Sequence, residues 1–352
     1  MEYQKISINT ASPLPVRARV MIIYTGGTAG MVADAHGTLR PFDFSLILQH
    51  IPTLRNLMLE LTVISFNEPV DSSNIGPREW VTLAEIVESN YNTQDGFVIL
   101  HGTDTMAYTA SALSFMLSGL NKPVIFTGAQ LSITHPRSDA RENLITALEI
   151  ASMRQDGNAF VPEVCIYFGN QLLRGNRSKK AESNHFDAFQ SENYPPLARA
   201  GVKIEFNNAV IRTTSADKLR IRKSICSDVS ILKIFPGITP AAVNPVLNAP
   251  GIKGVVIETF GSGNAPTARW FIDALTSAIK SGVIIVNVSQ CPGGMVQQGR
   301  YETSKELAGI GVIGGGDMTT EAAITKLMLG LGELKGPDLL NWLQSPVAGE
   351  RS

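Results

Sequence analysis

Two threonines in this sequence follow apolar runs and could act as nucleophiles if a base stood beside them. Thr25 comes directly after the run 20–24 and precedes Gly26-Gly27, and Thr103 follows the run 95–100 and the pair His101-Gly102. An apolar, β-branched run that stops at glycine is typical of a buried strand ending in a sharp turn. Ligands bind at the carboxyl ends of strands in open α/β sheets. Each hydroxyl is therefore predicted at such a strand end.

A threonine hydroxyl is barely ionised at neutral pH, so it needs a neighbouring group that takes its proton. Asp104 stands just before a predicted helix at 106–117, and Lys180 belongs to a basic cluster that follows a later strand. A lysine that is desolvated inside a site can lose its charge and accept such a proton. Simpler roles stay open: Asp104 can cap the helix, the glycines after Thr25 can only turn the chain, and the basic cluster can be a solvated surface.

Alternating strand-like and helix-like segments must position these groups. Strands alternating with helices over short distances predict a parallel sheet with right-handed crossovers. The polar loop 68–74, which carries Asp71, Ser72 and Ser73, follows one of the strands, and the loop 32–41 is long enough to form a lid. Strands are expected near 20–24, 61–66, 95–100, 124–127 and 164–168, with helices at 42–51, 77–87, 106–117 and 142–151.

The second half of the chain begins a new series of apolar strands, each followed by helix-competent sequence. We expect an α/β protein of two domains: a larger N-terminal domain with a mostly parallel sheet flanked by helices, and a smaller C-terminal α/β domain. The proposed boundaries are 1–210, a connector at 211–228, and 229–352. Strands are expected at 230–235, 254–259 and 282–288, with helices at 267–280 and 320–331.

The composition limits which kinds of binding partner and which cellular compartment are expected. The net charge is −1 and the sequence has no long lysine or arginine cluster, which argues against nucleic acid or an anionic membrane as a partner. The three cysteines are widely spaced, so neither a disulfide framework nor a zinc site is predicted. No secretory signal is evident, and no apolar run approaches the roughly eighteen residues of a membrane span. A cytoplasmic protein that acts on a small molecule is expected.

Four motifs together resemble the bacterial L-asparaginases, specifically the cytoplasmic type I group. The resemblance extends from about residue 20 to about residue 343, and two separate threonine motifs in this order make it specific. It implies hydrolysis of the side-chain amide of L-asparagine to L-aspartate and ammonia through a threonine acyl-enzyme, without metal or organic cofactor. The motifs are Tyr24-Thr25-Gly26-Gly27-Thr28, His101-Gly102-Thr103-Asp104-Thr105, Arg174-Gly175-Asn176-Arg177 with Lys180, and Gly261-Ser262-Gly263-Asn264-Ala265-Pro266.

The resemblance also implies a role for each matching residue. Thr25 would be the nucleophile, and Thr103, Asp104 and Lys180 would form a hydroxyl–carboxylate–amine relay. Asp104 would in addition bind the substrate's α-ammonium group through a charge-assisted hydrogen bond. Main-chain N–H groups near Thr103 are the expected donors to the oxyanion, worth roughly 3 kcal/mol each in other enzymes. The remaining substrate-binding positions are Asp71, Ser72, Ser73 and, from a neighbouring chain of a homodimer or homotetramer, Asn264.

One departure from the family concerns the loop after the first motif. Many relatives carry a tyrosine there whose hydroxyl contacts the nucleophile, whereas Thr38 takes that place here. Tyr24 should point to the face opposite Thr25, because strand side chains alternate. We therefore expect activation of Thr25 to rely on another donor or on water.

Two other functions remain open. The chain could be a non-catalytic relative that binds an amino acid, or a subunit of a transfer-RNA amidotransferase that generates ammonia and normally needs an extra N-terminal domain and a partner. The choice between asparagine and glutamine also stays open, because one methylene changes discrimination by only about 1–3 kcal/mol.

Overall fold

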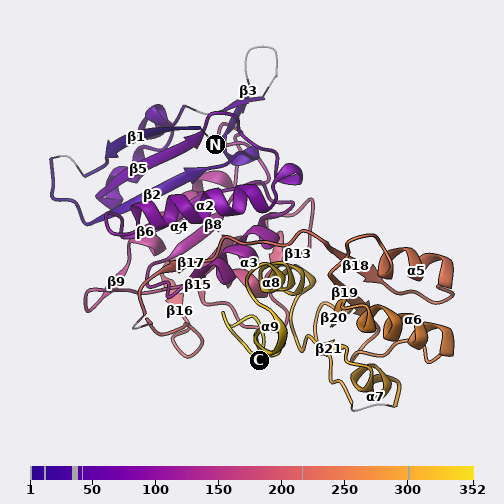
Figure 1. Cartoon of the computed structure of the whole chain (residues 1–352). Helices are drawn as coiled ribbons and strands as arrows, with labels where there is room; N and C mark the ends of the chain where they lie inside the picture. The colour runs from indigo at the N-terminus through magenta and orange to yellow at the C-terminus, as the bar shows by residue number, and fades with distance from the viewer. Residues whose placement is uncertain (1, 12, 34–38, 42, 216, 300–301) are drawn as a thin grey trace. The chain divides into compact units, whose positions relative to one another are not determined.

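The computed structural model describes residues 2–11, 13–33, 39–41, 43–215, 217–299 and 302–352 (Figure 1). They form two compact units, Met1–Ile221 and Arg222–Ser352, so the division falls within the stretch 211–228. Among the described residues, no helix is both long and apolar enough to cross a bilayer.

A nine-stranded sheet forms the centre of the first unit. Its strand order is β1-β5-β2-β6-β8-β11-β12-β15-β16, and the run from β5 to β11 is parallel, as predicted. Antiparallel strands extend the sheet on both sides. The strands are β1 (Tyr3–Asn9), β5 (Leu59–Phe66), β2 (Ala18–Tyr24), β6 (Gly96–Leu100), β8 (Val124–Thr127), β11 (Val164–Phe168), β12 (Gln171–Arg174), β15 (Ala198–Ala200) and β16 (Ile204–Phe206).

Strand β2 is buried along almost its whole length because it lies between β5 and β6 and is covered on both faces. Val20, Ile22 and Tyr24 share one face and pack into a cluster with apolar residues of the helix α4 (Ala140–Ser152). Tyr24 packs its ring against Phe44 at 5.2 Å, and its hydroxyl donates to the Gly30 carbonyl at 2.8 Å.

The helices of the first unit begin and end close to the predicted positions, with one exception. The predicted helix at 42–51 is only partly present: a 3-10 turn, η2 (Phe44–Leu46), leads into the four-residue helix α1 (Ile47–His50). Pro52 opens another 3-10 segment, η3 (Pro52–Leu57), and the residue before a proline is disfavoured in the helical region. The other helices are α2 (Pro77–Asn90) and α3 (Met106–Met116).

Short elements complete the first unit. Four two-stranded ladders pair β3 with β4, β7 with β17, β9 with β10, and β13 with β14. They are β3 (Met31–Ala33), β4 (Leu39–Pro41), β7 (Leu117–Ser118), β17 (Arg220–Ile221), β9 (Arg154–Gln155), β10 (Asn158–Ala159), β13 (Lys179–Lys180) and β14 (Phe189–Gln190), and the 3-10 turns are η1 (Thr28–Gly30), η4 (Ser72–Asn74) and η5 (Gly175–Arg177).

The second unit has a sheet of its own, with the order β18-β19-β20-β21 and every pair parallel. The strands and helices predicted for this half of the chain are present, and the described residues form three further helices. The elements are β18 (Val229–Lys233), α5 (Pro240–Leu247), β19 (Gly254–Thr259), α6 (Arg269–Lys280), β20 (Ile284–Ser289), α7 (Glu302–Gly309), β21 (Ile313–Gly314), α8 (Thr320–Glu333) and α9 (Gly336–Gln344).

A buried ion pair holds the C-terminal residues of the second unit against α8. The ammonium of Lys326 pairs with the carboxylate of Glu350 at 2.5 Å, and both side chains are fully buried. The same ammonium donates to the carbonyls of Ser345 and Leu343. Every proton of the ammonium is thereby given an acceptor, as a buried charge requires.

Candidate active site

The loops after β2, β5 and β6 come into direct backbone contact, and glycine makes that contact possible. A Cβ atom on Gly27 would lie 2.6 Å from the Cα of Gly102, and one on Gly102 would lie 2.6 Å from the Oγ of Ser72. A Cβ on Gly26 would overlap the carbonyl of Val70. Gly26 and Gly27 also have φ values of 137° and 87°, which disfavour any side chain. The three strand ends therefore meet at one edge of the sheet, as predicted.

Thr25 lies at the carboxyl end of β2 and is fully buried. Its N–H and its hydroxyl both donate to the carbonyl of Leu100, the last residue of β6, each at 3.1 Å. Its own carbonyl accepts from the N–H of Val70 at 2.7 Å. These bonds hold the residue between two neighbouring strand ends. A carbonyl cannot take up the hydroxyl proton, so any base must come from elsewhere.

Three of the predicted residues form one hydrogen-bonded cluster at the end of β6. The ammonium of Lys180 donates to the hydroxyl of Thr103 at 2.8 Å and to the carboxylate of Asp104 at 2.6 Å. The Lys180 side chain is 18% exposed and that of Asp104 is 64% exposed. A hydroxyl, an amine and a carboxylate thus lie in contact, and the carboxylate remains open to a charged ligand. No hydrogen bond joins this cluster to Thr25 among the described residues.

The basic motif before Lys180 is buried, so the solvated-surface interpretation is wrong for it. Arg174 forms an ion pair with Glu163 at 2.5 Å, with both side chains at most 5% exposed. The guanidinium also lies over the ring of Tyr194, 4.3 Å from its centre. Ser178 donates its hydroxyl to the Arg174 carbonyl at 2.7 Å, which fixes the turn that leads into Lys180. The buried pair therefore places the segment that carries the amine.

The loop after β5 is connected to the turn after β6. Asp71 accepts hydrogen bonds from the hydroxyl and the N–H of Ser73, and these bonds hold the pKa of the Asp71 carboxyl below its usual range. The Ser72 side chain is buried, and its carbonyl accepts from the hydroxyl of Thr105 at 2.6 Å. The three polar residues predicted in this loop are thus adjacent to the turn that carries Thr103.

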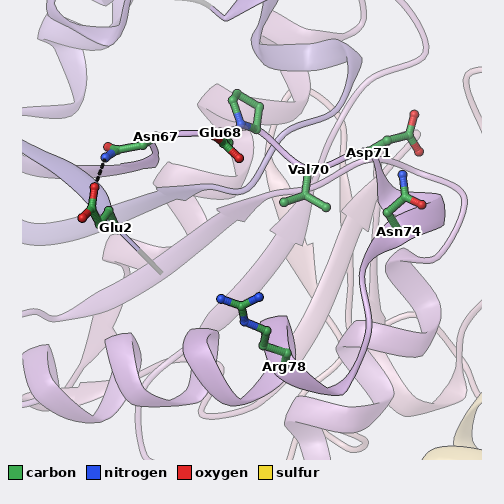
Figure 2. A pocket seen from close by; sticks show the side chains of 8 residues that line it. Glu2, Asn67, Glu68, Val70, Asp71, Asn74 and Arg78 are labelled. Carbon is green, nitrogen blue, oxygen red and sulfur yellow. Dashed lines mark hydrogen bonds between the residues drawn. The ribbon is translucent and has the colours of Figure 1, made fainter.

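A cavity of about 490 Å³ lies beside this loop and shares only Asp71 with the predicted site residues. Figure 2 shows Arg78 of α2 pointing from the helix toward the loop, with Val70 and Asp71 on the other side. This cavity does not include the hydroxyl–amine–carboxylate cluster. Its lining consists of Glu2, Asn67, Glu68, Pro69, Val70, Asp71, Asn74 and Arg78.

Comparisons with known proteins show which family the chain belongs to. The family model for the N-terminal asparaginase domain matches residues 19–212, and the model for the glutaminase/asparaginase C-terminal domain matches residues 228–341. The chain belongs to the asparaginase family. Family membership, together with the identity to an L-asparaginase given below, makes it an amidohydrolase.

Individual relatives of this asparaginase-family protein cover nearly all of the chain. It is 42% identical over 311 residues to L-asparaginase 1 of Escherichia coli (strain K12), covering 88% of this chain and 90% of that protein. The crystal structure of L-asparaginase I from Vibrio cholerae is 37% identical, with a TM-score of 0.87 and coverage of 96% and 100%. A glutamyl-tRNA(Gln) amidotransferase subunit of Pyrococcus abyssi is 34% identical over 349 residues, covering 96% of this chain and 77% of that protein.

Two further predicted residues, Asn264 and Thr38, are not among the described residues of the first unit. Asn264 lies in the second unit, where its main chain forms an isolated bridge with Phe260. Thr38, the residue in place of the loop tyrosine, lies outside the described residues. Within the described part of the chain, no group of three or more histidine, cysteine or acidic side chains could hold a metal ion.

His101 is a residue of the asparaginase motif whose contacts sequence reasoning missed. Its ring is buried, with Nδ1 2.6 Å from the carbonyl of Gly102 and Nε2 3.0 Å from the hydroxyl of Thr109. Burial lowers the pKa of the imidazole from 6.5 to about 4. The ring is therefore neutral at physiological pH. Its adjacency to Gly102 and Thr103 was the available signal, but the partner on α3 is visible only in the fold.

Proposed function

We propose that this protein hydrolyses the side-chain amide of L-asparagine to L-aspartate and ammonia through an acyl-enzyme on Thr25. The observation that carries the proposal is the Thr103–Lys180–Asp104 cluster, which lies at the end of β6 next to the strand end that holds Thr25. A nucleophilic hydroxyl needs a base and an oriented proton path. The cluster supplies an amine and a second hydroxyl for that path.

In the proposed reaction the oxygen of Thr25 attacks the amide carbon, and its proton passes to the departing nitrogen. The C–N bond breaks to release ammonia, and water then attacks the ester to regenerate the hydroxyl and release aspartate. Thr25 must first give up its hydrogen bond to Leu100. Lys180 accepts a proton only as the neutral amine, whereas in the structure it pairs with Asp104. The α-ammonium of the substrate competes for that carboxylate and weakens its hold on Lys180.

Substrate recognition follows from the polar groups around the three strand ends. Ser72 and Ser73 bind the α-carboxylate and amine, with Asp71 holding Ser73 in place through two hydrogen bonds. The main-chain N–H of Thr103 stabilises the oxyanion of the tetrahedral intermediate. Asn264 from a neighbouring chain completes the site, which makes the functional form a homodimer or homotetramer. The protein acts in the cytoplasm, and its three cysteines are unpaired there.

The test is ammonia release from L-asparagine and L-glutamine over a wide concentration range. Thr25→Ala removes the nucleophile and should abolish turnover, while Lys180→Met should lower it by a factor on the order of 10²–10⁴, the range for acid–base groups. Lys179→Met is the matched control, because this neighbouring exposed lysine lies outside the cluster. Full activity in Thr25→Ala would refute the proposed nucleophile.

Two other functions are outcomes of the same test. A binding protein would take up asparagine in calorimetry without releasing ammonia. An ammonia-generating component of an amidotransferase, the class to which the Pyrococcus abyssi relative belongs, would release ammonia only when a partner is added. Steady turnover by the purified chain alone excludes both.

A further inference from the structure

We propose that Trp80, Thr109 and His101 form a buried hydrogen-bond relay that orients the Gly102–Thr103 peptide, so that the Thr103 N–H points at the oxyanion of the reacting amide. The inference rests on the proposed function and adds positioning residues to it. None of the three side chains is proposed to touch the substrate.

The relay has only one consistent set of proton positions. The indole of Trp80 has a donor and no acceptor, so its N–H donates to the hydroxyl of Thr109, 3.1 Å away. A hydroxyl oxygen can accept two hydrogen bonds, so this bond alone does not fix where the Thr109 proton points. The Gly102 carbonyl fixes it: the carbonyl can only accept, so Nδ1 of His101, 2.6 Å away, carries the proton of the neutral imidazole. Nε2 is then unprotonated and accepts from the Thr109 hydroxyl at 3.0 Å. Every donor in the relay meets an acceptor.

Burial keeps the relay in this state. Thr109 of α3 is fully buried, His101 is 1% exposed and Trp80 of α2 is 6% exposed. The imidazole also packs edge-on against the ring of Phe126 at 5.8 Å. A charged imidazole would need a second acceptor and would lose its hydration, so the neutral form persists. The Nδ1-protonated tautomer is therefore fixed by its neighbours.

The tautomer matters because of the geometry of the next peptide. In a planar trans peptide the C=O and the following N–H point in opposite directions. Since the Gly102 carbonyl points at Nδ1 of His101, the Thr103 N–H points away from the buried ring. Among the described residues, this N–H makes no hydrogen bond within the protein. The same residue's hydroxyl contacts Lys180, so the free N–H lies beside the reactive cluster.

Without the Thr109 hydroxyl, the Gly102–Thr103 peptide should no longer be held in this orientation. Without a donor at Nε2, the imidazole can move its proton there, which places the Nδ1 lone pair against the Gly102 carbonyl. Two acceptors at 2.6 Å repel each other, and the peptide must rotate. An oxyanion donor acts only when it is aimed in advance, and losing one costs roughly 10²–10³ in kcat. A misaligned donor should forfeit a large part of that factor.

The experiment compares Thr109→Val, which keeps the shape but removes the hydroxyl, with Thr109→Ser, which keeps the relay. We expect Thr109→Val to lower kcat for L-asparagine at least about tenfold, while KM changes less than about threefold. Thr109→Ser should stay within about twofold of wild type. A purely structural role would lower stability without this split between kcat and KM. Equal kcat values for the Val and Ser variants would overturn the proposal.

A second measurement keeps the proposal testable if Thr109→Val does not fold. The ¹⁵N chemical shifts of His101 report its tautomer directly, and wild type should show protonated Nδ1 and bare Nε2. An Nε2-protonated ring would refute the relay even if the enzyme is active. If wild type releases no ammonia from asparagine, the proposed function fails by itself, and the tautomer still decides whether the relay exists.

Discussion

The close approach of Gly27 to Gly102 makes one substitution especially informative. In Gly27→Ala the new Cβ would lie 2.6 Å from the Cα of Gly102, whereas ordinary contact begins at 3.4 Å. The turn after β6 must therefore retreat by the difference, about 0.8 Å. A displacement of about 1 Å in a catalytic geometry costs on the order of a hundredfold in rate. We expect kcat/KM for asparagine to fall about a hundredfold.

The matched control separates this displacement from backbone strain. Gly157→Ala also places a side chain at positive φ, 81° against 87° for Gly27, but its Cβ would have no neighbour within 4 Å. Both variants should lose unfolding free energy in urea, on the order of 1–3 kcal/mol from backbone strain. Gly27→Ala should lose more, because Gly27 has a ψ of 166°, which essentially only glycine adopts, and its new Cβ overlaps Gly102. Only Gly27→Ala should lose activity. Similar kcat/KM values for folded Gly27→Ala and Gly157→Ala would refute the close contact between the turns after β2 and β6.

Three further predictions concern other parts of the molecule. Tyr24→Phe should lower the unfolding free energy by about 1–3 kcal/mol, since it leaves a buried carbonyl unpaired, and should keep turnover; lost turnover in a folded variant would contradict the proposed activation of Thr25. Because burial lowers the pKa of His101 from 6.5 to about 4, the protein should lose about 3 kcal/mol of unfolding free energy as the pH falls from 6.5 to about 4. An imidazole that titrates near pH 6.5 by NMR would contradict this prediction. Glu350→Gln should cost about 3–5 kcal/mol in urea by leaving the Lys326 ammonium unpaired, whereas Asp228→Asn in an exposed pair should not shift the midpoint.

The strand ends were predictable because the signals are local. The apolar runs before Thr25 and before His101, each followed by glycine, place both turns at the carboxyl edge of a parallel sheet. Edge strand β1 was missed because most of its side chains are exposed, and it carries little apolar pattern.

Contacts between distant segments could not be read from the sequence. Arg174 is buried because Glu163 and Tyr194, on other segments, receive its guanidinium, and no local pattern shows that. The relay beneath Thr103 likewise joins His101 to α2 and α3. The sequence motifs identify the residues of the site. Which ion-pair and hydrogen-bond partners those residues have depends on the fold.

The proposed acyl-enzyme can be tested most directly by trapping it. Wild-type protein, Thr25→Ala and Lys180→Met would be incubated with an electrophilic analogue of asparagine and examined by intact and peptide mass spectrometry. We predict one adduct per chain, located on Thr25, formed more slowly in Lys180→Met and absent in Thr25→Ala. An adduct on Thr103 instead, or an unmodified chain that still releases ammonia, would contradict the assignment of Thr25 as the nucleophile.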